Sequence, residues 1–357
     1  MSKKRIDAIR SQLRSENLHG LMVTHLDYVR YLAGFTGSSG LLVITQKSAD
    51  FFTDFRYKDQ ASKQVKGARV NIVKGDPTTT LKDFPRLNKR NALYGFDTEH
   101  TTVGAAERLR RQIPDAVLIP ATHLFTELGW VKESSELADI TAAVKISDTA
   151  FERILAIVKP GVRESELAAE LEYQMAMLGS ERPAFETIIA SGYRSAMPHG
   201  IASQKKVKAG EFITFDFGAT VNGYVSDITR TVVVGKATPR QKKVYSLVLK
   251  AQLAGIKKVK AGAEGRAVDD ACRKIITRAG QGKNFGHGTG HGIGFFVHVG
   301  PRVSSVSTDK LKVNNVITIE PGVYISGWGG VRIEDDVVVT RSGGRVLNKA
   351  PKNLLEL

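Results

Sequence analysis

The chain has 357 residues, 42% of them hydrophobic and 25% charged, which is long enough for two domains with separate cores. Its net charge of +16 is dispersed in short basic runs, so a solvated basic surface is favoured over a nucleic-acid interface, with attraction to acidic partners as the alternative. The single cysteine, Cys272, excludes an intramolecular disulfide and a thiolate zinc cluster, and no apolar run approaches about 18 residues, so we expect no membrane span.

The first part of the chain alternates helical and strand-like patterns. Ile6, Ile9 and Leu13 recur at helical spacing, whereas residues 41–44 and 51–53 have the composition of strands. No signal peptide is recognised before them, which favours a cytoplasmic protein. We therefore expect a mixed α/β domain over residues 1–124.

Beyond residue 124, the order of predicted elements repeats. Two helices, expected to be capped by Ser134 or Ser135 and by Ser165, precede the first group of strands. A second pair of helices, the first beginning at Thr238-Pro239, precedes the second group. The order indicates an α/β (α+β) fold with a weak internal duplication over residues 125–357, in which each half has one acidic hairpin.

The first acidic hairpin has a strong turn signal at Asn222-Gly223. A two-residue turn there makes the numbers of paired residues sum to 445, so Asp216 and Asp227 become diagonal neighbours on one face, roughly 7–8 Å apart. Both lie among aromatic and β-branched residues, where an uncompensated carboxylate is costly. We interpret the pair as ligands of a cation; an exposed acidic hairpin is the alternative.

The second acidic hairpin contains Glu320 and Glu334. We expect residues 317–320 to pair with residues 331–334, with both glutamates on one face and Arg332 beside them. The longer connecting loop fixes this register less firmly. The alternative interpretation of this hairpin is a ladder of salt bridges that faces the solvent.

Between the hairpins lies a glycine-rich histidine cluster, Gly286–Gly292, which contains His287 and His291. The glycines argue against a zinc-binding helix and let the backbone approach a site closely. Four carboxylates with one imidazole suit manganese, iron, cobalt or zinc. Their charge would balance two divalent ions, and such a pair supports hydrolysis by a metal-activated water.

These residues lie in motifs that resemble the pita-bread-fold metallopeptidases, specifically the Xaa-Pro peptidases of the aminopeptidase P and prolidase family, short bacterial type. The resemblance covers essentially the whole chain. In the N-terminal part it rests on residues 31–37 and 53–57, which look like a creatinase-type N-domain. In the catalytic part it rests on residues 197–200, 216–218, 226–230, 286–294, 297–298, 319–322 and 331–335.

The resemblance implies a role for each candidate residue. Asp227 and Glu334 would bridge two divalent ions, with manganese the first choice and cobalt or zinc as alternatives. Asp216 would complete one ion, and His291 with Glu320 the other. Three further roles follow: His199 and His298 would contact the substrate and assist proton transfer, Glu320 would also act as a proton shuttle, and His287 with Arg332 would lie at the proline pocket.

The expected protein is a homodimeric exopeptidase that hydrolyses the bond before proline, in Xaa-Pro dipeptides or at the N-terminus of longer peptides. A methionine-aminopeptidase-like enzyme would share the five ligands but normally lacks the N-domain. A catalytically silent pita-bread module that binds partners through its basic surface would be expected to have degraded ligands. All five ligand positions are intact, which favours the enzyme.

Overall fold

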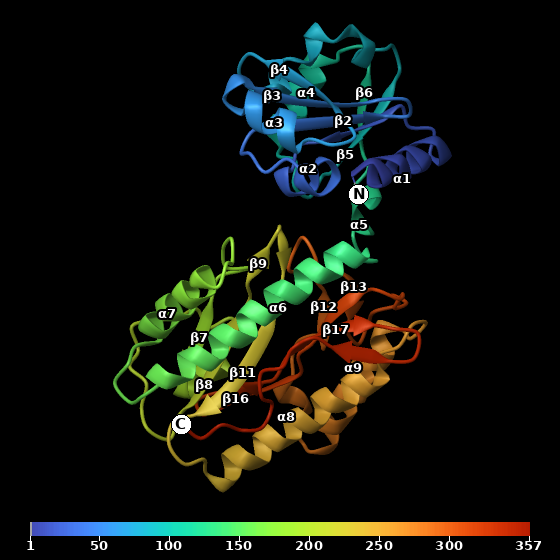
Figure 1. Cartoon of the computed structure of the whole chain (residues 1–357). Helices are drawn as coiled ribbons and strands as arrows, with labels where there is room; N and C mark the ends of the chain where they lie inside the picture. Colours follow the sequence, from blue (N-terminus) through green and yellow to red (C-terminus); the bar gives the residue numbers. More distant parts are fainter. Residues whose placement is uncertain (1) are drawn as a thin grey trace. The chain divides into compact units, whose positions relative to one another are not determined.

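The computed structural model describes residues 2–357, which form two compact units that meet between Leu128 and Gly129 in the sequence. Figure 1 follows the chain from the blue N-terminal unit to the larger unit that ends in red. The sequence-based boundary at residue 124 lies within the short helix α5 (His123–Thr126). Among residues 2–357, no helix is both long and apolar enough to cross a lipid bilayer.

The N-terminal unit is built on one mixed six-stranded sheet. Its strand order is β4-β3-β2-β1-β5-β6, with antiparallel pairing of β2 to β1 and β3, and parallel pairing elsewhere. The strands are β1 (Gly20–Val23), β2 (Leu41–Thr45), β3 (Ala49–Asp54), β4 (Arg69–Val73), β5 (Leu93–Phe96) and β6 (Val117–Pro120). The helices before α5 are α1 (Ser2–Ser15), α2 (Leu26–Ala33), α3 (Lys58–Gln64) and α4 (Val103–Gln112).

The hydrophobic pattern of this unit explains its elements. Ile6, Ile9 and Leu13 are buried along one side of α1, as helical spacing requires. Strand β2 is buried along nearly its whole length, which is why its sequence is a continuous apolar run rather than an alternating one, and β3 is buried throughout although it also contains two aspartates. The predictions of a first helix and of two strands here are confirmed.

The C-terminal unit contains the predicted repetition of helix pairs and strands. Its helices are α6 (Ser134–Ile154), α7 (Glu164–Met177), α8 (Pro239–Lys258) and α9 (Gly265–Arg278). The strands of the first half are β7 (Ile188–Ser191), β8 (Phe212–Phe217), β9 (Thr220–Val221), β10 (Tyr224–Val225) and β11 (Ile228–Val233). Those of the second half are β12 (Gly290–Gly292), β13 (Val299–Val303), β14 (Val316–Ile319), β15 (Gly322–Ile325), β16 (Gly329–Arg332), β17 (Asp335–Val339) and β18 (Gly344–Val346).

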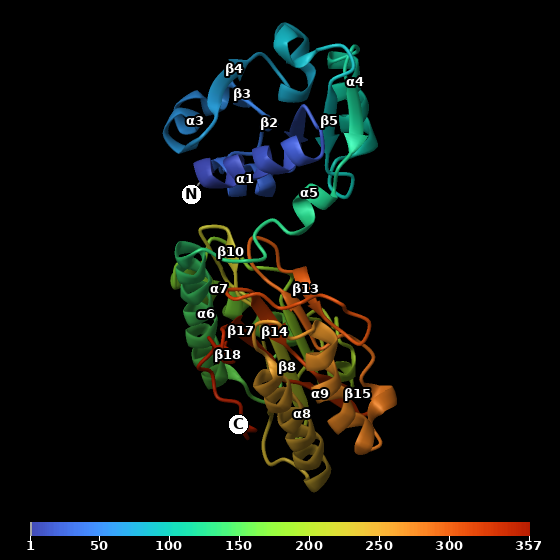
Figure 2. The same ribbon diagram turned by 90° about the vertical axis from the view of Figure 1, so that its right-hand side faces the viewer.

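The strands of this unit lie between the two helix pairs, as Figure 2 shows. On one side, Phe151 of α6 and Leu171 of α7 pack with Phe215 of β8. On the other side, Val248 of α8 and Cys272 of α9 pack with strands β14 and β17. Each helix pair thus covers its own apolar core, and the polar residues between the two cores are free to form a site.

Two helix starts differ from the prediction. Helix α6 is preceded by Glu133 rather than capped by Ser134 or Ser135, because the Glu136 carboxylate accepts a hydrogen bond from the Glu133 amide at 2.6 Å. Glu166 does the same for the Arg163 amide at 2.8 Å, so Ser165 does not cap α7. In both helices the glutamate of the first turn provides the cap. The predicted start of α8 at Thr238-Pro239 is confirmed.

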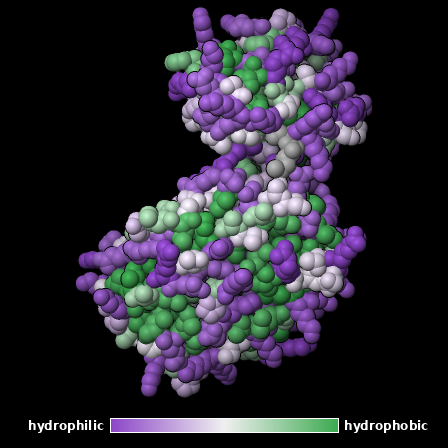
Figure 3. Space-filling view, in the orientation of Figure 1, coloured by the Kyte–Doolittle hydropathy of each residue, from purple (hydrophilic) through white to green (hydrophobic). Residues whose placement is uncertain are grey.

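In the face seen in Figure 3, hydrophilic residues are spread over each unit, with apolar residues between them. Several basic side chains, including Lys242, Lys250 and Lys257 of α8, are exposed. The positive charge of the chain is therefore carried largely by side chains in contact with solvent.

Candidate metal centre and catalytic cavity

One cavity of about 440 Å³ in the C-terminal unit brings together all nine residues singled out from the sequence. Its polar lining comprises Asp216, Asp227, Glu320, Glu334, His199, His287, His291, His298 and Arg332. Apolar walls are added by Phe185, Ile188, Pro198, Ile201 and Val297, with Glu186 beside them. These residues come from both halves of the unit, so the folded chain, not any single segment, creates the site.

The register of the first acidic hairpin follows the prediction. Thr229 lies opposite Asp216 and Val225 lies opposite Thr220, so paired residue numbers sum to 445 on both sides of a short interruption. At that interruption a Cβ on Gly218 would lie 1.9 Å from the carbonyl oxygen of Ser226, so only glycine fits there. The Asn222-Gly223 turn therefore brings Asp216 and Asp227 to the same cavity.

The expected pairing of the second hairpin is wrong in one respect. Strand β14 pairs with β17, with Ile319 opposite Asp335, while β15 pairs with β16, with Gly322 opposite Arg332. Residues 317–319 therefore pair with residues 335–337, and not with residues 331–334. Both ladders have the same register, since paired residue numbers sum to 654 in each. Glu320 and Glu334 lie opposite each other in the short interval that separates the two ladders. The two glutamates therefore line one cavity although neither belongs to a paired strand.

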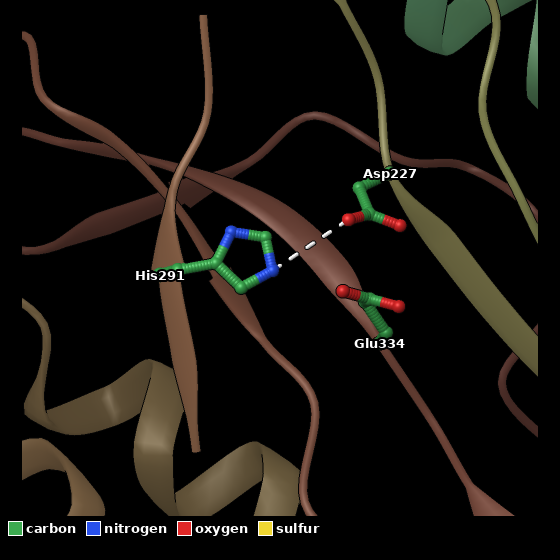
Figure 4. A group of neighbouring side chains, drawn as sticks. All are labelled: Asp227, His291 and Glu334. Atoms are coloured by element: carbon green, nitrogen blue, oxygen red, sulfur yellow. Dashed lines mark ion pairs between the residues drawn. The ribbon is translucent and has the colours of Figure 1, made fainter. Parts of the chain in front are cut away.

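Three of these side chains form a group suited to a metal ion. Asp227, His291 and Glu334 each offer a ligand atom, and these atoms all lie within 4.8 Å of one another. Figure 4 shows the three side chains pointing toward a common point from separate segments of the chain. Asp216 and Glu320 line the same cavity but are not members of this group.

The tautomer of His291 suits a metal ligand. Its Nδ1 is 3.1 Å from the carbonyl oxygen of Gly292, which requires Nδ1 to carry the proton. Its Nε2 faces Glu320 at 3.3 Å and Asp227 at 3.7 Å. A backbone acceptor on one ring nitrogen, with the other directed at carboxylates, is the usual arrangement around a bound cation.

Nearby cationic side chains do not offset the burial and mutual repulsion of the Asp227 and Glu334 carboxylates. Burial, followed by repulsion from neighbouring carboxylates, raises the pKa values of Asp227 and Glu334 well above their ordinary values. Glu334 Oε2 accepts a hydrogen bond from Thr229 at 2.6 Å, but Oε1 is buried and has no partner among the described residues. An orphaned carboxylate oxygen within an acidic, largely buried cluster fits a divalent cation.

Glu320 and Asp216 are each paired with a cationic side chain. Burial opposes ionisation of Glu320, but the hydrogen bond and charge of His291 outweigh it and lower its pKa to about 2. For Asp216 burial wins and raises the pKa, although Arg332 Nη2 donates a hydrogen bond to its Oδ2. Counted together, four carboxylates, one arginine and one histidine leave this cluster with excess negative charge.

Tyr324, which the sequence analysis did not single out, links Arg332 to His287. Arg332 Nη1 donates to the Tyr324 hydroxyl at 2.7 Å, and His287 Nε2 lies 2.9 Å from the same oxygen. Burial lowers the pKa of His287, which favours the neutral ring. In that ring Nδ1 donates to the Gly288 carbonyl at 2.7 Å, so Nε2 accepts the Tyr324 hydroxyl proton while the hydroxyl oxygen accepts from Arg332.

The remaining two histidines reach the cavity from different loops. The His298 ring packs against His291 with 4.4 Å between ring centroids, and burial followed by the His291 charge lowers the pKa of His298. His199 follows Pro198, whose carbonyl oxygen accepts a hydrogen bond from Arg332 Nη2 at 3.2 Å. The cavity thus offers imidazoles, a carboxylate cluster and an apolar wall within one space.

Comparison with known proteins places both units in described families. The family model "Metallopeptidase family M24" matches residues 138–341, and "Creatinase/Prolidase N-terminal domain" matches residues 5–128. The chain is 41% identical over 353 residues to the Bacillus subtilis (strain 168) protein named "Uncharacterized peptidase YqhT", covering 99% of this chain and 100% of that one.

Two solved structures are similar over nearly the whole chain. The Xaa-Pro dipeptidase from Bacillus anthracis has a TM-score of 0.96 and 41% identity, covering 100% of both chains. The X-Pro aminopeptidase from Thermotoga maritima MSB8 has a TM-score of 0.89 and 36% identity, covering 96% of this chain and 100% of that one. The two similar proteins have names that specify different substrate lengths.

Proposed function

Because this chain belongs to metallopeptidase family M24 and carries the creatinase/prolidase N-terminal domain, we propose that it is a metal-dependent exopeptidase that hydrolyses the peptide bond before proline. The observation that carries the proposal is the group of Asp227, His291 and Glu334, whose ligand atoms converge and whose two buried carboxyl groups have raised pKa values because neighbouring carboxylates repel them. The printed names of the similar structures, both Xaa-Pro peptidases, support the choice of substrate.

The ligand set we propose consists of Asp216, Asp227, His291, Glu320 and Glu334, holding two divalent ions. Asp227 and Glu334 would be shared, Asp216 would belong to one ion, and His291 with Glu320 to the other. Manganese is the proposed metal, with cobalt or zinc as alternatives, because oxygen-rich donors with one imidazole suit these ions. The chemistry that such ions supply is activation of water and polarisation of a carbonyl group.

The protein's own groups would bind the peptide and move its protons. We assign His199 and His298 to contact the peptide near the scissile bond, where an imidazole can stabilise developing negative charge. We assign Glu320, which faces His291, to carry a proton to the departing imide nitrogen of proline. Arg332 and the neutral His287 would support the wall that receives the proline ring, since Tyr324 fixes both.

Substrate length is the open part of the activity, and one assay decides it. The manganese-loaded protein is incubated with an Xaa-Pro dipeptide and with an Xaa-Pro-Yaa-Zaa peptide, and products are identified by mass. Release of Xaa from the dipeptide alone assigns a dipeptidase; release from the longer peptide assigns an aminopeptidase. Cleavage of neither would refute the proposed function.

Asp227→Asn provides the matched control for this assay. The substitution keeps the side chain's shape and removes one ligand charge, so activity should be abolished while the fold is largely retained. Near-normal turnover by this variant would contradict its role as a ligand of both ions.

The resemblance to the family also supports a cytoplasmic homodimer, and we include both in the proposal. Light scattering of the purified protein tests the dimer, which predicts a mass of twice the 38.9 kDa of the chain. A monomer over the concentrations used in the activity assay would refute that part without affecting the proposed chemistry.

A further inference from the structure

A single carboxylate, Glu164 at the start of α7, accepts five hydrogen bonds although its side chain is fully buried. Its Oε1 accepts from the amide and the hydroxyl of Ser191, at 2.7 and 2.8 Å. Its Oε2 accepts from Arg194 Nε at 2.9 Å and from the amide and hydroxyl of Ser203, at 3.1 and 2.6 Å. This carboxylate therefore has its burial compensated by hydrogen bonds from three residues.

Those partners lie at the two ends of one loop. Ser191 is the last residue of β7, and Ser203 follows residues 192–202, so Glu164 ties both ends of this loop to the start of α7. Arg194, held by Glu164, extends its Nη2 to the carbonyl oxygen of Ile201 at 2.5 Å and so braces the loop across its middle.

The same loop forms one side of the catalytic cavity. Pro198, His199 and Ile201 all line that cavity. On the cavity side the loop is held by the second hairpin: the Gly330 amide donates to Ser195 Oγ at 2.8 Å, and Arg332 donates to the Pro198 carbonyl. Within residues 2–357 no hydrogen bond holds the His199 ring itself, so the backbone of the loop determines where this side chain begins.

We propose that Glu164 is a positioning residue for the hydrolytic reaction, acting through His199 by fixing the loop of residues 192–202. The proposal rests on the proposed function for its catalytic consequence. Its physical basis is that a displacement of a reacting group by about 1 Å can cost on the order of 100-fold in rate. Glu164 does not line the cavity, and among the described residues its carboxylate accepts hydrogen bonds only from Ser191, Arg194 and Ser203, so its effect must pass through the loop.

Glutamine at position 164 tests this idea with little change in shape. A carboxylate offers two accepting oxygens, whereas an amide offers one oxygen and one donating NH₂ group. One of the two sets of donors, at Ser191 or at Arg194 and Ser203, must then face another donor, so one end of the loop is released. Ser203→Ala is the milder variant, since it removes only the 2.6 Å hydroxyl bond.

The decisive experiment is a double-mutant cycle on the manganese-loaded protein. Glu164→Gln should lower kcat for Xaa-Pro hydrolysis by about 10- to 100-fold and change KM by less than about threefold. In a His199→Ala background the same substitution should cost less than about threefold, because the group that the loop positions is already absent. An equal fold-loss in both backgrounds, or an unchanged kcat, would overturn the proposal.

Asp50→Asn is the matched control, because Asp50 is also fully buried and paired with an arginine, Arg86 at 2.7 Å, but lies in the sheet of the N-terminal unit. It should lower the unfolding temperature and leave kcat unchanged. If Glu164→Gln does not fold, Ser203→Ala carries the same test, with a smaller loss of kcat that again disappears in the His199→Ala background.

Hydrogen exchange separates the failure of this proposal from failure of the proposed function. Peptides covering residues 191–203 should exchange faster in Glu164→Gln than in the wild type, while peptides from α8 and α9 stay unchanged. This readout needs no substrate, so it applies even if the wild type cleaves no Xaa-Pro bond. Unchanged exchange in residues 191–203 would show that Glu164 does not hold the loop.

Discussion

Replacing Glu334 with glutamine should stabilise the metal-free protein and remove its response to divalent ions. Asp216 is paired with Arg332, and His291 faces both Glu320 and Asp227, so Glu334 is the carboxylate of the cluster that has no ion pair among the described residues. Glu334 Oε1 has no hydrogen bond among the described residues. Removing this charge relieves repulsion in the metal-free state but deletes a proposed ligand shared by both ions.

The distance between the Asp227 and Glu334 carboxylates determines how much stability Glu334→Gln should gain. Their ligand atoms lie within 4.8 Å, and two unit charges at that distance repel by about 3.5 kcal/mol at an effective dielectric constant of about 20. The actual repulsion is smaller than this, because the raised pKa values of Asp227 and Glu334 let one of the two carboxyl groups take up a proton. We therefore expect Glu334→Gln to gain about 1–3 kcal/mol in free energy of unfolding, or several degrees in Tm.

The stability that the metal-free protein gains from Glu334→Gln should depend on pH. A carboxyl group with a raised pKa stays protonated in the folded chain at pH values where it ionises in the unfolded chain, so the stability of the metal-free wild type falls as pH rises above the ordinary carboxyl range. The advantage of Glu334→Gln should therefore be larger at pH 8 than at pH 5.

Thermal unfolding with EDTA and with manganese measures both effects. Manganese at 100 times its Kd should stabilise the wild type by about 2.7 kcal/mol and the variant by much less. Asp50→Asn, which removes a carboxylate that already has its cation, should instead lower the Tm of the metal-free protein. A metal-free Glu334→Gln protein less stable than the wild type at pH 8, or one with an undiminished manganese shift, would refute the charge argument.

Three other substitutions test separate parts of the account. Tyr324→Phe leaves Arg332 Nη1 and His287 Nε2 without their shared partner, so we expect a loss of about 1–3 kcal/mol for each in urea unfolding and at least a tenfold lower kcat/KM; wild-type values would contradict the link. His298→Gln should lower kcat by about 100-fold with metal content unchanged, and a loss of bound metal would instead assign it to the ligands. Burial lowers the pKa of Lys132 to about 7, so its charge destabilises the fold fully below pH 7 and progressively less as pH rises toward its ordinary value; Lys132→Met should raise Tm most below pH 7, and a lower Tm there would contradict this.

The sequence predicts those parts of the site whose geometry is determined by a short segment, such as a tight turn. A two-residue Asn-Gly turn allows only one register, so Asp216 and Asp227 could be brought together from residue numbers alone. The loop between Glu320 and Glu334 is longer, and the strand pairing expected there was wrong although the two glutamates face the same cavity. Tyr324 was missed, yet alternation along β15 places it on the face of Glu320, so a period of two could have found it.

The residues that support the site lack such a signal. Glu164 is 27 and 39 residues away from its serine partners, and no spacing in the chain relates them. At two helix starts, a glutamate in the first turn competed successfully with the serine that propensity favours for the cap. Contacts of this kind depend on the assembled fold, and sequence patterns do not contain them.

The most direct test of the central claim is anomalous diffraction at the manganese edge, on crystals of this protein grown with Mn²⁺. We predict two peaks in the cavity, each within coordinating distance of Asp227 and Glu334, with Asp216 beside one and His291 with Glu320 beside the other. The absence of any peak within reach of these five side chains at millimolar Mn²⁺ would contradict the assignment of the cluster as a metal centre.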